Sequence, residues 1–262
     1  MTDPQRNIQV SFHRCEDDAR YANRTENPFL AVRERRLAAL IVHGLPRSGQ
    51  ILEIGCGEGA NLYFLREARP DAFLIGLDFS PAKIDYLYRR CIANAAVCAD
   101  AAALPFADHS FDLVFCRDVL HHVSWNRDGV IAEALRVTRP EGRVVVLESD
   151  GRKLINRLFQ SLYPAERGLR DSTPITISAL ARRHGELRAL VPVEASCLLR
   201  AFGFLLGLPR GTLSPIMQAM YFIISWYERM VMAVLPPQRW YYWMMEVHPH
   251  PQPQPSPKAR NS

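Results

Sequence analysis

Lysine is scarce in this chain of 262 residues, because only Lys83, Lys153 and Lys258 are lysines and arginine carries most of the positive charge. The formal net charge is +5. No stripe of basic residues interleaves with aromatic ones, as nucleic-acid-binding surfaces require. The run Arg33 to Arg36 predicts the solvated face of a helix rather than a nucleic-acid patch. Mild basicity also suits a surface that meets anionic lipid or an acidic substrate.

Paired cysteines are missing too, since none of the six cysteines shows C-x-x-C spacing. This pattern favours free thiols in a reducing compartment, and we expect Cys56, Cys98 and Cys116 to be small buried residues beside core strands. The first ten residues lack a charged region followed by an apolar stretch, so no secretory signal is predicted. We therefore expect a cytoplasmic protein, which could associate with the inner face of the membrane. No histidine spacing indicates a metal site, and no repeat is found.

No apolar run is long enough to cross a membrane, which takes about 20 residues. The most apolar stretches are 197–208 and 216–235, and Glu228 and Arg229 interrupt the second. Three interpretations stay open for it. It could be a lid over a hydrophobic substrate, it could lie in a membrane interface through Trp226 and Tyr227, or it could be core and dimer surface.

The stretch Gln50 to Leu62, QILEIGCGEGANL, organises the chain. A short buried strand, Ile51 to Ile54, runs into three glycines, and a helix begins at Ala60. Glycines at this spacing let the chain turn tightly and let a ligand lie against bare backbone. The helix N-terminus behind them offers free N–H groups to an anionic or polar group. The stretch therefore predicts a nucleotide-type pocket.

Two nucleotide classes fit these letters. Gly55-x-Gly57-x-x-Ala60 satisfies the dinucleotide fingerprint. The same stretch also reads Glu53-x-Gly55-x-Gly57-x-Gly59, and in this form the chain resembles the class I S-adenosylmethionine (SAM)-dependent methyltransferases. The resemblance implies a Rossmann-like, doubly wound α/β fold with a mainly parallel seven-stranded sheet.

A second motif separates the two classes. The run from Asp100 to Asp112 reads D-x-x-x-L-P-F-x-D-x-S-F-D, which resembles small-molecule methyltransferases of the ubiquinone/menaquinone type. Dehydrogenases that use NAD do not typically carry it. The resemblance covers residues 51–149 well and the C-terminal third loosely.

Acidic residues follow two predicted strands at the positions where the family binds its cofactor. Asp78 lies 19 residues after Gly59, close to the ~20 expected for the acid that takes ribose hydroxyls; a role as a helix cap is the alternative. Asp100 resembles the acid that accepts from the adenine amino group. The resemblance assigns cofactor contacts to Glu53, Gly55, Cys56, Gly57, Asp78, Phe79, Asp100, Ala101 and Cys116.

Catalytic residues are less marked. His121 and His122 follow the strand that ends near Cys116, where several relatives place pocket residues. Because adjacent side chains point in different directions, we expect at most one of them to face a substrate, and the alternative is a histidine packing a helix start. Glu148 ends the next strand, at the edge where open α/β sheets bind ligands, although it could equally pair with an arginine.

Four regions are predicted. Residues 1–45 form an N-terminal helical cap, irregular up to about residue 27, whose Tyr21, Arg24 and Asn27 could line the pocket or lie on the surface. Residues 46–150 form the SAM-binding core, with a turn at 139–142. Residues 151–247 complete the sheet, with an amphipathic helix over 153–163, a turn at 164–168, and apolar helices inserted between the last two strands. Residues 248–262 are a disordered proline-rich tail.

The leading hypothesis is methyl transfer from SAM to a small or lipid-like acceptor by in-line displacement. The chain lacks the Asn/Asp-Pro-Pro-Tyr motif and the Pro-Cys loop of nucleobase methyltransferases. A catalytically inactive SAM-fold scaffold or peripheral membrane subunit is the alternative, and an NAD-binding oxidoreductase follows it. We expect no nucleic-acid partner, and a peripheral membrane contact through 197–235 is a further hypothesis.

Overall fold

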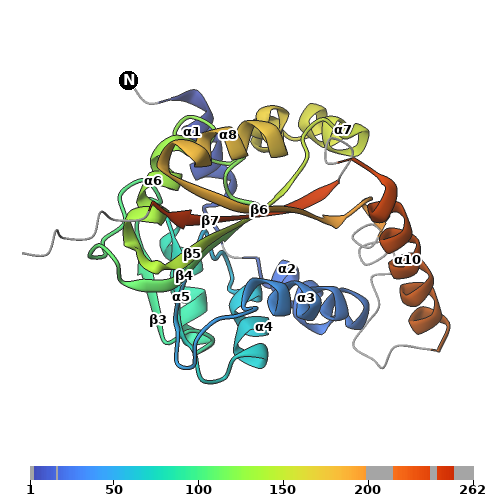
Figure 1. Ribbon diagram of the computed structural model, residues 1–262, viewed down its shortest axis with the longest axis horizontal. Coiled ribbons are helices and arrows are strands. Elements are labelled where there is room, and N and C mark those ends of the chain that lie inside the picture. The colour runs from blue at the N-terminus through green and yellow to red at the C-terminus, as the bar shows by residue number, and fades with distance from the viewer. Residues whose placement is uncertain (1–2, 16, 199–214, 237–240, 251–262) are drawn as a thin grey trace, which may run out of the picture.

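The computed structural model describes residues 3–15, 17–198, 215–236 and 241–250. One sheet of seven strands, in the order β3-β2-β1-β4-β5-β7-β6, runs through the molecule (Figure 1). The strands are β1 (Gln50–Ile54), β2 (Phe73–Asp78), β3 (Ala95–Cys98), β4 (Phe111–Arg117), β5 (Thr138–Ser149), β6 (Gly185–Glu194) and β7 (Tyr242–Pro249). The first five pair in parallel, whereas β7 is antiparallel to both of its neighbours. This confirms the predicted fold class.

Helices cover both faces of the sheet (Figure 1). Alternate residues of β1 enter different cores: Ile51 packs with residues of α3, α4 and α5, and Leu52 with residues of α6 and α8. Such alternation is expected for a strand buried on both faces. The helices of these layers are α3 (Pro28–Ile41), α4 (Ala60–Ala68), α5 (Pro81–Arg89), α6 (Arg127–Val137) and α8 (Pro174–His184).

The N-terminal region is helical where the sequence predicts irregular chain. It contains α1 (Pro4–Phe12) and α2 (Asp18–Glu26). Both begin at an aspartate N-cap: Asp3 accepts from the N–H of Gln5 at 2.7 Å, and Asp17 from that of Arg20 at 2.8 Å. The prediction is wrong because these helices are short and polar, so caps rather than an apolar stripe mark them.

The C-terminal half carries three further corrections. The predicted turn 139–142 lies inside β5, where the pairing with β4 jumps from Thr138 to Arg143 and leaves a bulge. The predicted turn at 164–168 is the start of the 3₁₀-helix η1 (Pro164–Asp171), which follows α7 (Leu154–Leu162). His248 and Pro249 extend β7 rather than the predicted tail, and residues 251–262 lie outside the described part of the chain.

The apolar insertion is found between β6 and β7, as predicted. Its described helix is α10 (Pro215–Val234), and residues 199–214 lie outside the described chain. None of the described helices combines the length and apolar character that a membrane span requires. On α10 the side chains of Ser225 and Glu228 are buried, whereas large apolar side chains face solvent: Phe222, Ile223, Trp226, Tyr227, Met230 and Val234. An assignment of these six to the core is therefore wrong.

Candidate functional site

The glycine turn between β1 and α4 is built as the sequence predicts. Gly55, Gly57 and Gly59 all have left-handed backbone conformations, with φ of 71°, 55° and 80°. A Cβ at Gly55 would lie 2.5 Å from Val119, and one at Gly59 would lie 2.3 Å from Leu87. A Cβ at Gly57 would meet no atom of the described residues within 4 Å. Gly55 and Gly59 therefore allow close packing, and Gly57 presents bare backbone to open space.

Asp78 holds this turn to the end of β2. Its Oδ2 accepts from the N–H of Gly57 at 3.0 Å, and its Oδ1 accepts from the N–H of Ser80 at 2.9 Å. The N-cap of α5 is Ser80, so Asp78 is not the helix cap that the alternative interpretation requires. The carboxylate is buried, at 5% exposure, and it stands beside the open backbone of Gly57.

Asp100 and Phe79 form the more open side of the same edge. The Asp100 side chain is 53% exposed; it accepts from the N–H of Ala102 at 2.9 Å and lies 3.4 Å from the guanidinium of Arg6. Phe79 is 40% exposed. Ala101 follows Asp100 and is half-buried. Phe79 follows the C-terminal end of β2 and Asp100 follows that of β3. The ring of Phe79 and the carboxylate of Asp100 could therefore contact a planar heterocycle at this edge of the sheet.

Glu53 is fully buried, and only one of its oxygens is bonded. Asn61 donates to Oε1, while Oε2 has no partner among the described residues. Burial raises the pKa of Glu53 to about 8, against the effects of Asn61, Arg24 and Arg117. An orphaned buried oxygen in a native fold calls for an explanation, and a cationic or hydrogen-bonding ligand group would satisfy it.

The raised pKa of Glu53 predicts a pH-dependent stability. Between the unfolded pKa near 4.5 and the folded value of about 8, the folded chain binds the extra proton, so this contribution is present below pH 4.5 and is lost as pH rises through 8. We expect Glu53→Gln to lose less stability than the wild type between pH 6 and pH 9. Urea unfolding at both pH values measures this, and an equal loss in the two proteins would contradict it.

The cysteines of the region do not all behave as predicted. Cys56 and Cys116 are buried, and burial raises the pKa of both thiols. They are therefore small apolar packing residues rather than nucleophiles. Cys98 is exposed, which contradicts its predicted burial. It ends β3, which lies at the edge of the sheet and, in the described part of the chain, pairs with β2 alone.

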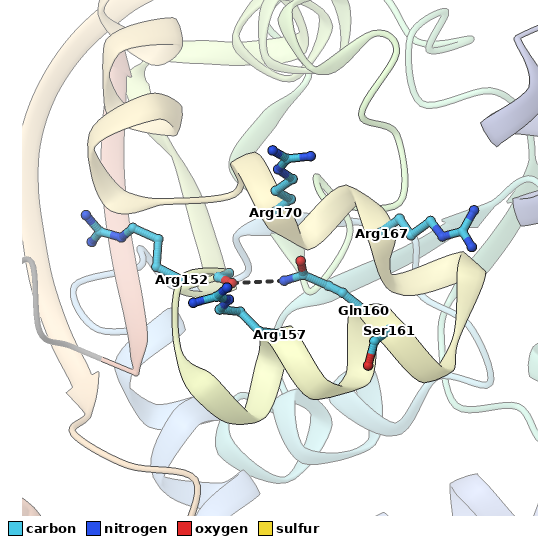
Figure 2. A pocket seen from close by; sticks show the side chains of 7 residues that line it. Arg152, Arg157, Gln160, Ser161, Arg167 and Arg170 are labelled. Carbon is cyan, nitrogen blue, oxygen red and sulfur yellow. Dashed lines mark hydrogen bonds between the residues drawn. The ribbon is translucent and has the colours of Figure 1, made fainter.

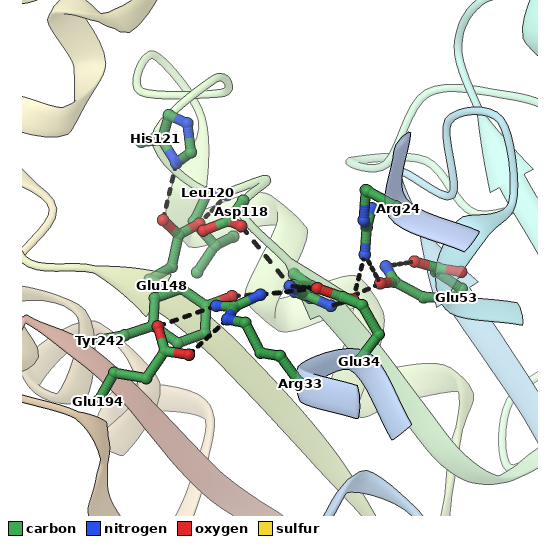
Figure 3. A network of polar contacts seen from close by, with 12 residues as sticks. Arg24, Arg33, Glu34, Glu53, Asp118, Leu120, His121, Glu148, Glu194 and Tyr242 are labelled. Carbon is green, nitrogen blue, oxygen red and sulfur yellow. Dashed lines mark hydrogen bonds and ion pairs between the residues drawn. The ribbon is translucent and has the colours of Figure 1, made fainter. Parts of the chain in front are cut away.

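A buried network of arginine and glutamate side chains lies next to Glu53 (Figure 3). Glu34 on α3 pairs with Arg33 and with Arg24, each at 2.7 Å, and also accepts from Arg117. Burial alone would raise the pKa of Glu34, but Arg117, Arg24 and Arg33 together hold it well below its usual value. Arg117 also donates to Asn61 at 2.8 Å. The network therefore fixes the amide that holds Glu53.

This network overturns the predicted solvated role of Arg33 and Glu34, whereas Arg35 of the same run is exposed, as predicted. Arg33 and Glu34 are each 3% exposed rather than solvated, because Arg33 also pairs with the buried Glu194 of β6. Of the residues predicted to line the pocket, Arg24 joins the network through Glu34 and Asn61. The side chains of Tyr21 and Asn27 are buried.

Glu34→Ala is expected to destabilise the fold by about 3–5 kcal/mol, because it leaves buried arginines without their shared carboxylate. Glu67→Ala is the matched control, since Glu67 pairs with the exposed Arg35 of the same helix at 2.9 Å and exposed pairs contribute about 0–1 kcal/mol. Urea unfolding of both variants measures the difference. Equal midpoints would show that the buried network does not stabilise the fold.

His121 and Glu148 form a buried pair at the ends of β4 and β5. Nδ1 of His121 lies 2.7 Å from Oε2 of Glu148, whose Oε1 accepts from the N–H of Leu120 at 2.6 Å. Among the described residues, Glu148 thus pairs with a histidine and not with an arginine. Burial lowers the pKa of His121, but the Glu148 carboxylate outweighs this and raises it above its usual value. The carboxylate also fixes the ring, so that Nε2 is the nitrogen that does not face Glu148.

Both histidines face the same cluster, which contradicts the expectation that their side chains diverge. The rings of His121 and His122 lie 4.0 Å apart between centroids. The reason is local: Asp118 has a φ of 55°, and the residues after it form turns rather than a strand or helix. Burial and the neighbouring His121 and His13 lower the pKa of His122 well below its usual value.

Two residues missed in the sequence complete the cluster. Glu166 of η1 lies 3.6 Å from Nε2 of His121. His13, just after α1, places its ring 4.7 Å from His122 and 6.2 Å from Phe79. The potential ligand atoms of His121, His122 and Glu166 lie within 4.8 Å of one another, so this trio could hold a metal ion. No sequence spacing reveals it, because Glu166 comes from a separate element.

The sheet order, with its antiparallel seventh strand, and the glycine turn after β1 define the fold of the class I SAM-dependent methyltransferases. Residues 52–146 match a family described as a methyltransferase domain. The chain is 33% identical over 137 residues to the demethylmenaquinone methyltransferase of Tropheryma whipplei (strain Twist). The aligned stretch covers 52% of this chain and 56% of the relative. The match therefore spans about half the length of that relative.

Solved structures share the fold over nearly the whole chain. The geranyl diphosphate C-methyltransferase of Streptomyces coelicolor A3(2), in complex with Mg²⁺, geranyl diphosphate and S-adenosyl-L-homocysteine, has a TM-score of 0.60 at 15% identity and covers 95% of this chain and 99% of that one. The phosphoethanolamine N-methyltransferase 2 of Haemonchus contortus has a TM-score of 0.61 at 17% identity and covers 96% and 61%. The resemblance to class I methyltransferases read from the sequence is confirmed.

Proposed function

We propose that this protein transfers a methyl group from SAM to a small hydrophobic or lipid-like acceptor. The observation that carries the proposal is the open backbone of Gly57, with Asp78 and the unpartnered oxygen of Glu53 beside the same turn. Asp78 would take the ribose hydroxyls, and Glu53 would take the amino group of the methionine part. Phe79 and Asp100 would receive the adenine. Because Glu53, Asp78 and Asp100 are all retained, an inactive scaffold is disfavoured.

His121 is the proposed proton acceptor. SAM supplies an electrophilic methyl group, so the protein has to align the acceptor and exclude water, which can contribute about 7–11 kcal/mol. Where the acceptor atom carries a proton, Nε2 of His121 would remove it, and Glu148 would stabilise the resulting imidazolium through Nδ1. α1 and His13 lie over this edge and would cover the bound cofactor.

A hydrophobic acceptor is supported by two observations. The Tropheryma whipplei relative is a demethylmenaquinone methyltransferase, and α10 turns an apolar face to solvent. We infer that this face meets either the acceptor or the membrane that contains it. A peripheral membrane contact through 197–235, at the inner face of the membrane, is part of the proposal.

Titration of the purified chain with S-adenosylhomocysteine, with NAD as the comparison, tests the cofactor class. We expect saturable heat with S-adenosylhomocysteine and none with NAD. The second step is transfer of radiolabelled methyl from SAM to quinones, phenols and polyprenyl lipids, read in the lipid extract. A folded chain that binds NAD and not S-adenosylhomocysteine would overturn the proposal.

A further inference from the structure

On α7 the polar side chain of Asn156 is buried and three leucines are exposed, whereas an ordinary surface helix turns such leucines inward. Ile155 of the same helix packs partly buried against the core. Asn156 is buried and donates to the carbonyl of Asp150 at 2.8 Å, and Gln160 donates to that of Gly151 at 2.9 Å. Leu154, Leu158 and Leu162 are 83%, 52% and 62% exposed. Since they recur every four residues, they form one stripe along the helix.

Arginines line a concavity beside α7. Gly151, Arg152, Arg157, Gln160, Ser161, Arg167 and Arg170 line a concavity of about 650 Å³ between α7 and η1 (Figure 2). Arg152 pairs with Asp150 at 2.6 Å. Arg157, Arg167 and Arg170 are exposed, and none of them pairs with an acid in the part of the chain that the structure describes. The concavity therefore carries uncompensated positive charge.

We propose that α7 and η1 form a docking surface for an anionic lipid bilayer. An exposed leucine stripe beside arginines is the combination that lies in a membrane interface, with the leucines among the acyl chains and the cations at the headgroups. A soluble partner of opposite charge would satisfy the arginines but not three leucines exposed by more than half. The surface adds to the contact proposed for α10, and both helices lie towards the same end of the molecule (Figure 1).

The placement of η1 connects this surface with the reaction site. Its buried side carries Ala165, Gly168 and Leu169, and a Cβ at Gly168 would lie 1.8 Å from the carbonyl oxygen of His121. Glu166 faces His121 from the same helix. One side of η1 therefore packs on the histidine cluster while Arg167 and Arg170 face the concavity. Docking would bring the bilayer next to the site where, on the proposed function, a lipid-like acceptor reacts.

Co-sedimentation of the full chain with vesicles tests the surface. We expect binding to phosphatidylglycerol vesicles, weak binding to phosphatidylcholine vesicles, and loss of the difference at high salt. Each arginine near an anionic surface contributes about fivefold in affinity. Arg157→Gln with Arg170→Gln should therefore weaken binding to anionic vesicles about 30-fold. The control variant Arg47→Gln with Arg89→Gln removes the same formal charge from the loop before β1 and from α5. Its binding to anionic vesicles should stay close to that of the wild type.

The leucine stripe has its own test. Leu158→Ser should weaken binding to anionic vesicles, whereas Tyr88→Ser, at an exposed aromatic on α5, should not. Heat of S-adenosylhomocysteine binding, measured without vesicles, should be equal in all four variants and reports folding separately from docking. Equal binding to the two vesicle types, or equal losses in the test and control variants, would overturn the proposed surface while leaving the proposed methyl transfer untouched.

Discussion

Asp78→Ala is expected to weaken binding of S-adenosylhomocysteine at least about 100-fold. The proposed role gives the carboxylate two charge-assisted hydrogen bonds to ribose hydroxyls, each contributing about 1.5–3 kcal/mol. The substitution also frees the N–H groups of Gly57 and Ser80, which Asp78 now binds at 3.0 and 2.9 Å. The turn would lose its link to β2 along with its ribose ligand. Isothermal titration calorimetry measures the change directly.

Asp71→Ala is the matched control for this variant. Asp71 stands before β2, at the opposite end of the same strand, and its Oδ2 accepts from the N–H of Ser48 at 2.9 Å. Like Asp78, Asp71 therefore accepts a hydrogen bond from a backbone N–H, but it lies away from the carboxyl ends of the strands. We expect Asp71→Ala to bind S-adenosylhomocysteine like the wild type. Comparable losses in the two variants would show that Asp78 acts through fold stability and not as a ligand.

The parts of the site that depend on local spacing could be predicted from the sequence. The three glycines have to follow a buried strand within a few residues, and Asp78 has to end the next strand, so their order along the chain specifies their places. Glu148 and His121 could each be predicted at the same edge by this reasoning. Their pairing at 2.7 Å could not be, because it depends on how the ends of β4 and β5 meet.

The parts that depend on tertiary packing were missed or wrongly assigned. Glu166 and His13 reach the histidine cluster from η1 and from the chain after α1, and neither segment carries a motif. Arg33 and Glu34 look like a solvated helix face in the sequence. They are buried because carboxylates and guanidinium groups from other elements compensate them, and periodicity does not record such partners.

Helices α7 and α10 each bury a polar side chain and expose several apolar ones. The sequence alone does not reveal this orientation either. Their sequences predict amphipathic or apolar helices, which normally turn the apolar side inward. In the structure Asn156 and Glu228 face inward, and Glu228 accepts from the N–H of Ser196 at 3.2 Å. Which face of a helix is buried depends on the hydrogen-bond partners that the rest of the fold offers.

Removal of the imidazole in His121→Ala should lower the rate of methyl transfer about 10²–10⁴-fold, the usual contribution of a general base, with binding of S-adenosylhomocysteine retained. The base must be neutral to accept a proton. Since Glu148 raises the pKa of His121 above 6.5, the rate should fall as pH drops through that raised value. A rate unchanged in His121→Ala would mean that the acceptor needs no base at this position.

Glu148→Gln tests whether the Glu148 carboxylate only holds the fold or also raises the pKa of His121. The amide keeps a hydrogen-bonding oxygen for the N–H of Leu120 but removes the charge that raises the pKa of His121. We expect that pKa to fall, the acidic limb of the rate profile to move to lower pH, and turnover to decrease because the imidazolium is no longer stabilised. Titration of the His121 ring protons by NMR, in the wild type and in Glu148→Gln, measures the pKa change without any knowledge of the acceptor. An unchanged titration would show that Glu148 holds the fold and does not tune the histidine.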